Sequence, residues 1–159
     1  MQRRAALLLP LAGLSACGFR LAAPTRYPFR SIALVGFAPE SPLAAALQRA
    51  LAPQVQVKPV PAEAEVVLQA LVDQRERSAA ATTATGQVRE LQLRLLATVR
   101  ADTPGGHVLM APVALRLVRE LSTNETAALA KGEEETEIFR EMQSDVVAQL
   151  LRRLAALPL

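Results

Sequence analysis

Apolar and polar residues alternate along three long stretches in the middle of the chain. The clearest is 87–101, where apolar residues at every second position predict a strand with one face toward a core. The stretches 65–77 and 108–120 show the same alternation. We expect one face of 65–77 to consist of Val66, Leu68, Ala70 and Val72, one face of 87–101 of Leu91, Leu93, Leu95, Ala97 and Val99, and the inward face of 108–120 of Leu109, Ala111, Val113, Leu115 and Leu117.

Two shorter strands and a helix precede these stretches. Residues 31–37 form a mostly apolar run and 55–58 a shorter one, and both patterns predict strands. Between them Ser41 and Pro42 mark a helix start, because serine caps a helix N-terminus and proline suits the first helical position. Apolar residues then recur at helical spacing up to Pro53, which predicts an amphipathic helix.

Turn-forming residues separate the long strands. Residues 78–86 are small and uncharged, which predicts a long, mobile hairpin tip. Residues 102–106 contain a proline and two glycines, which predicts the second turn. Pro112 has no backbone N–H, so its strand is expected to lie at a sheet edge or to contain a bulge.

The longest helix is predicted over 133–157. The glutamates at 133–135 fall in its first turn and Arg152 and Arg153 in its last, both favourable to the helix dipole. Lys131 is expected to precede the helix. Apolar residues recur every four positions along it, at Ile138, Met142, Val146, Leu150 and Leu154.

Together these elements predict an α+β fold, a two-layer sandwich in which two helices cover one face of a sheet of about four strands. The sheet must be mixed, because the first two strands are joined through a helix and the later ones by hairpins. Apolar residues make up 51% of the chain, which is enough for a core. That core must be aliphatic, since the chain has no Trp and one Tyr.

The N-terminus has the pattern of a secretion signal followed by a lipid attachment site. Arg3 and Arg4 precede an apolar run that is too short to cross a bilayer, which needs about 20 apolar residues. Leu14-Ser15-Ala16-Cys17 resembles the bacterial lipobox, in which a diacylglycerol is attached to the thiol, the signal is cut before the cysteine and the new amine is acylated. We therefore divide the chain into a signal peptide (1–16), a lipidated tether (17–30) and one domain (31–159).

Cys17 is the only cysteine, so it cannot form an internal disulfide, and lipidation gives a reason for its presence. The alternative is a buried thiol behind an N-terminal helix. Gly18 stands where aspartate would be the inner-membrane retention signal of enteric-type lipoproteins. The resemblance therefore implies the outer membrane, with the domain facing the periplasm. Within the tether, Tyr27 and Phe29 are expected to dock onto the domain.

Charge and composition give no support to nucleic-acid binding or catalysis. The formal net charge of +3 falls to about +1 without Arg3 and Arg4, there is no basic block, and aromatic residues make up 3% of the chain. His107 is the single histidine and has no partner for a metal site. Glu133–Glu135 has the pattern of a solvated helix start. We expect no enzyme, no metal and no cofactor other than the acyl chains on Cys17.

Five arginines lie on or near the long strands. They are either solvent-facing charges or contacts for an anionic partner such as a lipid phosphate, which the planar guanidinium fork suits. The tip at 78–86 is similarly either a flexible loop or a segment that a partner orders. The five are Arg89, Arg94, Arg100, Arg116 and Arg119.

Several segments, in order along the chain, resemble the LptE family of lipopolysaccharide-assembly lipoproteins. Cys17-Gly18-Phe19-Arg20-Leu21 is similar to the start of the family's mature chain, and Gly86-Gln87 to its entry into a long strand. Residues 124–131 resemble its Ala-Leu-Ala-Lys segment, and 141–154 its closing helix. The resemblance implies two helices on one side of a four-stranded sheet.

The resemblance also implies a function. LptE-like proteins plug the outer-membrane barrel LptD, help it assemble and bind lipopolysaccharide. Lys131 matches the family's lysine, which implies a lipopolysaccharide contact. Ala84 and Thr85 stand where a basic residue is common, and Arg89 is the expected substitute. The alternatives are a stand-alone periplasmic lipid-binding or ABC-transport auxiliary lipoprotein, and an anchored hydrolase built around His107.

Overall fold

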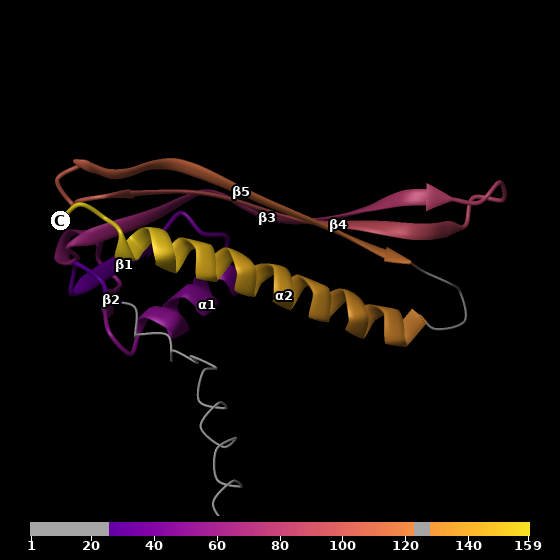
Figure 1. Ribbon diagram of the computed structural model, residues 1–159, viewed down its shortest axis with the longest axis horizontal. Coiled ribbons are helices and arrows are strands. Elements are labelled where there is room, and N and C mark those ends of the chain that lie inside the picture. The colour runs from indigo at the N-terminus through magenta and orange to yellow at the C-terminus, as the bar shows by residue number, and fades with distance from the viewer. Residues whose placement is uncertain (1–25, 123–127) are drawn as a thin grey trace, which may run out of the picture.

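Five strands and two helices follow one another in the part of the chain that the computed structural model describes, residues 26–122 and 128–159 (Figure 1). The strands are β1 (Ser31–Val35), β2 (Gln56–Lys58), β3 (Val66–Thr82), β4 (Val88–Asp102) and β5 (Val108–Ser122). The helices are α1 (Pro42–Leu51) and α2 (Ala128–Ala155), and a short 3-10 helix, η2 (Pro61–Glu63), links β2 to β3.

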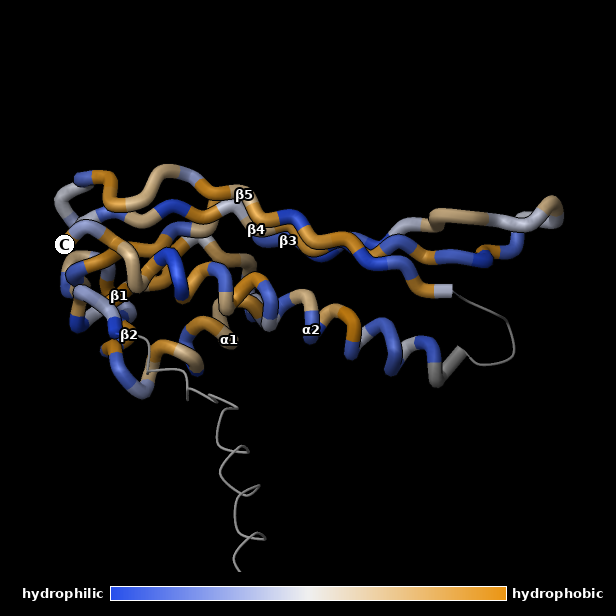
Figure 2. The backbone as a smooth tube through the Cα atoms, in the orientation of Figure 1, coloured by the Kyte–Doolittle hydropathy of each residue, from blue (hydrophilic) through white to orange (hydrophobic). Residues whose placement is uncertain are grey.

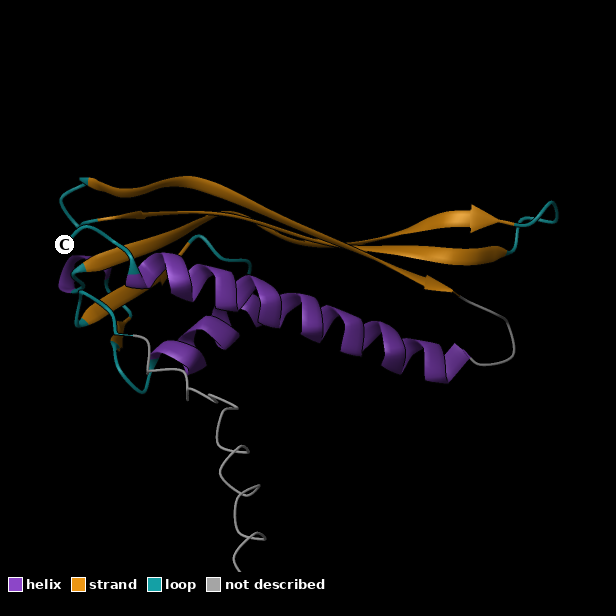
Figure 3. Ribbon diagram, viewed as in Figure 1, coloured by secondary structure: helices purple, strands orange, loops and turns teal. Residues whose placement is uncertain are grey.

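The strands form one mixed sheet in the order β2-β1-β3-β4-β5. β1 pairs in parallel with β2 and β3, whereas β3, β4 and β5 form an antiparallel meander. α1 and α2 lie on the same face of this sheet, called the helix-covered face below (Figures 1 and 3). The predicted α+β sandwich is confirmed, with five strands where about four were expected.

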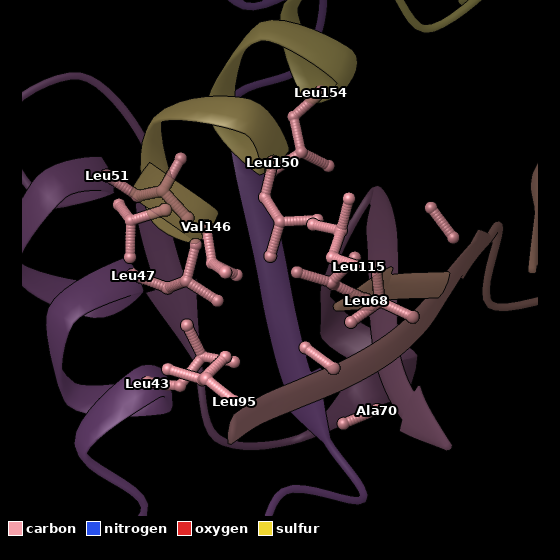
Figure 4. Packing of buried hydrophobic residues seen from close by; sticks show 14 of the residues in the cluster. Leu43, Leu47, Leu51, Leu68, Ala70, Leu95, Leu115, Val146, Leu150 and Leu154 are labelled. Carbon is pink, nitrogen blue, oxygen red and sulfur yellow. The ribbon is translucent and has the colours of Figure 1, made fainter. Parts of the chain in front are cut away.

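The core lies between the helices and the sheet, and it is largely aliphatic. Three leucines of α1 are each at most 2% exposed, and such burial contributes roughly 1.5–3 kcal/mol per side chain. Phe29 is also buried, with its ring centre 5.6 Å from that of half-buried Tyr27, which confirms that these residues dock onto the domain. Figure 4 shows the meeting of α1, α2 and the sheet through Leu43, Leu47, Leu51, Leu68, Leu95, Val146, Leu150 and Leu154.

A β-bulge at Leu71 exchanges the two faces of β3. Ala70 pairs with Val99 but Val72 pairs with Thr98, so Leu71 is an extra residue, and it is 48% exposed. The prediction that Val72 shares one face with Val66, Leu68 and Ala70 is therefore wrong, because Val72 lies with Thr98 on the outer face of the sheet. Beyond the bulge, the helix-covered face of β3 presents Asp73, Arg75, Arg77 and Ala79.

The edge strand β5 has a bulge at its proline. Val99 of β4 pairs with Val113 of β5, and Ala101 pairs with Met110. Between these two pairs β5 has two residues, Ala111 and Pro112, whereas β4 has only Arg100. The expectation that Pro112 marks an edge or a bulge is confirmed in both respects. The bulge also interrupts the alternation, so Ala111 is exposed rather than directed inward as predicted.

The two hairpin turns have the same hydrogen bonds. At the tip, the Thr83 N–H donates to the Gln87 carbonyl (2.8 Å), the Gly86 N–H to the Thr83 carbonyl (2.9 Å) and the Gln87 N–H to Thr83 Oγ1 (3.1 Å). Residues 103–107 repeat these bonds at 2.8, 2.9 and 3.1 Å. The glycines have φ of 83° and 85°, a left-handed conformation that favours glycine. β3 continues to Thr82, so the tip is shorter than predicted.

α2 begins earlier than its sequence pattern predicts, at Ala128 rather than Glu133. Glycine weakens a helix interior, so Gly132 is consistent with a helix that begins after it, yet α2 continues through Gly132. Lys131 therefore lies within the helix rather than before it. The glutamates at 133–135 consequently follow the first turn, which contains no acidic residue.

Candidate ligand-binding end and helix–sheet contacts

Arg89 is an exposed residue near the start of β4. Ala81 pairs with Glu90 and Thr82 with Val88, so Arg89 is the extra residue of another bulge. Among the described residues, no ion pair of Arg89 is found. Arg89 is therefore an exposed cation beside the hairpin tip.

Lys131 lies on the first turns of α2 and is partly covered. Its Nζ is 2.7 Å from Glu134 Oε2, one turn along the helix, and its side chain is 25% exposed. Pairs of this spacing stabilise a helix by about 0.2–0.5 kcal/mol. An anionic ligand at Lys131 would therefore have to compete only with a weak local partner.

The structure brings Arg89 and Lys131 to the same end of the molecule. The start of α2 lies beneath the far half of the β3–β4 hairpin, whereas its last residues lie near β1 and β2 at the other end (Figure 1). With 17 residues, β3 is about 55 Å long, so the hairpin extends far from β1 and β2. The hairpin tip and the first turns of α2 are called the tip end below.

A buried polar contact joins β3, α2 and α1. Gln143 is 8% exposed; its Nε2 donates to the Pro42 carbonyl at 2.8 Å, and its Oε1 accepts from Arg75 Nη2. The Arg75 guanidinium carbon also lies 5.3 Å from the centre of the Phe139 ring, a cation–π contact. Leaving such a buried amide unpaired costs about 1–3 kcal/mol, so these bonds fix the position of α2.

Two ion pairs connect the sheet to α2 on either side of this contact. Arg77 Nε lies 3.3 Å from Glu135 Oε2, with side chains 60% and 22% exposed. Arg119 Nη2 lies 3.8 Å from Asp145 Oδ2, with side chains 52% and 59% exposed. Pairs this exposed contribute about 0–1 kcal/mol each, so they hold the helix only weakly.

Other strand arginines are paired on the outer face. Arg94 Nη1 lies 3.6 Å from Glu76 Oε2 on the neighbouring strand. Arg100 donates two hydrogen bonds of 2.7 Å to the Asp102 carboxylate, and this hydrogen bonding, with the negative charge, raises the pKa of Arg100. These two arginines are therefore partly neutralised by the protein itself.

The residues considered for catalysis are placed in structural roles. His107 is exposed, and its backbone N–H donates to Thr103 Oγ1 within the second turn. Glu134 and Glu135 pair with Lys131 and Arg77. Within 26–122 and 128–159, no group of three or more His, Cys, Asp or Glu side chains is placed to hold a metal ion.

Among the helices described, neither is long and apolar enough to cross a membrane. Cys17, the predicted lipidation residue, lies outside the described residues.

Sequence reasoning missed the polar residues between α2 and the sheet. Gln143 could have been recognised from the sequence, since it stands within the apolar stripe of α2 between Phe139 and Val146, where a polar side chain needs a partner. Arg75 and Arg77 could not have been recognised, because the bulge at Leu71 decides which face of the sheet they occupy.

The long meander covered by two helices on one face defines a two-layer α+β domain. Residues 29–154 match the family described as Lipopolysaccharide-assembly, LptE, so the chain belongs to the LptE family, whose members are lipopolysaccharide-assembly lipoproteins. The expected family is thereby confirmed. No protein among the curated sequences matches the chain.

Solved structures of bacterial lipoproteins share the fold. The solution structure of lipoprotein B from Nitrosomonas europaea has 26% identity and a TM-score of 0.72, over 87% of this chain and 91% of that one. Rare lipoprotein B from Shewanella oneidensis has 22% identity and a TM-score of 0.63, over 80% and 95%. A minor lipoprotein from Acinetobacter baumannii has 20% identity and a TM-score of 0.64, over 83% and 96%.

Proposed function

We propose that the mature protein is an outer-membrane lipoprotein that assembles with an LptD-type β-barrel, plugs its lumen and assists lipopolysaccharide transport to the cell surface. Acyl chains on Cys17 anchor it, with its domain on the periplasmic side. The match to the LptE family over residues 29–154 carries the proposal. Its role is binding and assembly, not catalysis.

The shape of the domain supports this role. The backbone leading into β1 lies at the end opposite the tip end, where the Gln56 N–H donates to the Arg30 carbonyl at 2.9 Å. The first described residues of the domain therefore lie at the end far from the hairpin tip, and in this proposal the lipidated segment joins the domain there. Such a domain can remain tethered at one membrane surface while its hairpin extends into a barrel.

The proposed lipopolysaccharide contacts are Arg89 and Lys131 at the tip end. Lipopolysaccharide carries phosphate groups, for which Arg and Lys are the usual partners in proteins. Two cations contributed by different elements to one end of the molecule fit a ligand with more than one anionic group.

The test is affinity purification of the native lipoprotein from detergent-solubilised outer membranes. We expect an outer-membrane β-barrel to co-purify in a stable ratio, and an unrelated outer-membrane lipoprotein with the same tag to recover none. A lipoprotein that elutes as a stable monomer without a barrel would overturn the proposal and favour a stand-alone lipid-binding protein.

A further inference from the structure

A strip of leucines on β4 lies beneath α2. Leu91, Leu93 and Leu95, called the leucine strip, point to the helix-covered face and are at most 9% exposed. In the register of the sheet, Leu93 lies directly between Arg77 of β3 and Arg119 of β5. The apolar strip is therefore flanked by a guanidinium on each side.

The two ion pairs between the sheet and α2 have the same polarity. The cations Arg77 and Arg119 are on the sheet, and their partners Glu135 and Asp145 are on α2. Arg75, next along β3, likewise reaches from the sheet to Phe139 on the helix. Moving the first half of the helix away would remove Glu135 and leave the Arg77 guanidinium beside an apolar strip, whereas Asp145 and Gln143, the partners of Arg119 and Arg75, lie on the second half.

The first half of α2 is held less firmly than the second. From Lys131 to Glu141, only Phe139 is buried, and this half otherwise consists mostly of exposed polar residues (Figure 2). The ion pair from Glu135 is largely exposed and therefore weak. Local opening is easiest where few apolar side chains are buried. The second half is fixed in the core by Met142, Val146, Val147, Leu150 and Leu154.

We propose that the first half of α2 is a hinged cover, and that the leucine strip beneath it binds an acyl chain of an anionic amphiphile. Arg77 would hold the phosphate or carboxylate head of that amphiphile, since guanidinium pairs well with both. The apolar chain replaces the contacts that Phe139 gives up when the cover opens.

This site rests on the proposed function in one respect: lipopolysaccharide is an amphiphile of the required class. It differs from the tip-end contacts, because the strip takes acyl chains whereas Arg89 and Lys131 take exposed anionic groups. It would give the protein a means of shielding one acyl chain while the head remains in water.

Two single variants of the full chain provide a matched test. Glu135→Gln and Arg77→Gln break the same ion pair and so loosen the cover alike. Only the first retains the guanidinium on the sheet. The probe is cis-parinaric acid, a fluorescent fatty acid, with its neutral methyl ester for comparison.

We expect Glu135→Gln to bind the acid about threefold more tightly than the natural chain, because the open state is more populated and Arg77 is unpaired. The arginine variant should bind the acid no more tightly than the natural chain, and the ester should bind both variants alike. Amide hydrogen exchange over 131–141 should rise in both.

Equal binding of the acid by the two variants, or no saturable binding despite faster exchange over 131–141, would overturn the proposal. Barrel co-purification with the same variants keeps this test separate from the proposed function. A barrel that still co-purifies while the probe does not bind refutes the acyl site alone, and the reverse result refutes the barrel partner alone.

Discussion

At the scale of single residues, Gly36 is the position where the backbone leaves least room. It has φ of 74°, and a Cβ there would lie 2.4 Å from the Ala70 carbonyl oxygen. We expect Gly36→Ala to lower the free energy of unfolding by more than about 2 kcal/mol, measured by denaturant unfolding. Gly86→Ala is the control: φ is 83° but nothing lies within 4 Å, so only about 1 kcal/mol is expected. Equal losses would contradict the role of the Ala70 contact.

Tyr27 makes the free energy of unfolding depend on pH. Burial raises its pKa above the ordinary value of 10.0, so the folded state holds the phenolic proton more tightly than the unfolded state. The associated stability is fully present below pH 10.0 and is lost as the pH rises through the folded-state pKa. Tyr27→Phe should keep the ring contact with Phe29 and remove this part of the alkaline loss.

As Tyr27 is the only tyrosine, tyrosinate absorbance of the full chain reports its ionisation alone. We expect its midpoint to lie above that of the chain unfolded in denaturant. Coincident midpoints would show that Tyr27 is not docked on the domain in solution.

At the scale of elements, hydrophobic periodicity predicts which segments are strands and helices. It does not predict where a bulge exchanges the two faces of a strand. The pattern over 87–101 predicts five buried positions of β4, from Leu91 to Val99, because that strand keeps its alternation through the core; Ala101 and Asp102 are buried as well and were not predicted. On β3 and β5 it fails at Val72 and Ala111, because bulges depend on how neighbouring strands pair, which a single strand's pattern does not contain. The helix cap at Ser41 is local, and its Oγ accepts from the Ala44 N–H as predicted.

The tip end is where two elements combine for ligand binding, and charge reversal tests it. Arg89→Glu together with Lys131→Glu should weaken lipopolysaccharide binding at least tenfold, since two charge-assisted contacts become repulsive. Stability should change by less than about 1 kcal/mol, because Arg89 is exposed and the pair of Lys131 with Glu134 contributes only about 0.2–0.5 kcal/mol. The measurement is equilibrium binding of purified lipopolysaccharide to the full chain, with unfolding as a check.

Arg49→Glu is the matched control for this prediction. Arg49 is an exposed arginine in the last turn of α1, on the half of the molecule away from the hairpin tip. Its reversal changes the net charge without touching the tip end. Equal weakening by Arg49→Glu would mean that overall charge, and not the tip end, determines binding.

At the scale of the whole molecule, the candidate site was less predictable than the fold. Arg89 and Lys131 were selected from resemblance, and only the length of β3 and the direction of α2 place them at one end. The contact of Arg75 with Gln143 joins residues 68 positions apart, and it depends on the bulge at Leu71, which turns Arg75 toward the helix-covered face. No local pattern contains that information, so the helix–sheet boundary had to be seen in three dimensions.

The anchor is the last property that concerns the molecule as a whole, and Cys17→Ser tests it. Phe29, near the end of the tether, and the core residues behind it all follow Cys17 in the chain, so we expect the domain to fold without a contribution from Cys17. We expect the variant to lose all covalently attached acyl chains by mass spectrometry and to leave the membrane fraction, while the free energy of unfolding of its domain is unchanged. Two or more acyl chains give stable anchoring where one is marginal, so the loss of membrane association should be nearly complete. A natural chain whose Cys17 is unacylated in its own membrane would contradict the anchor, and barrel binding would then have to rely on the domain alone.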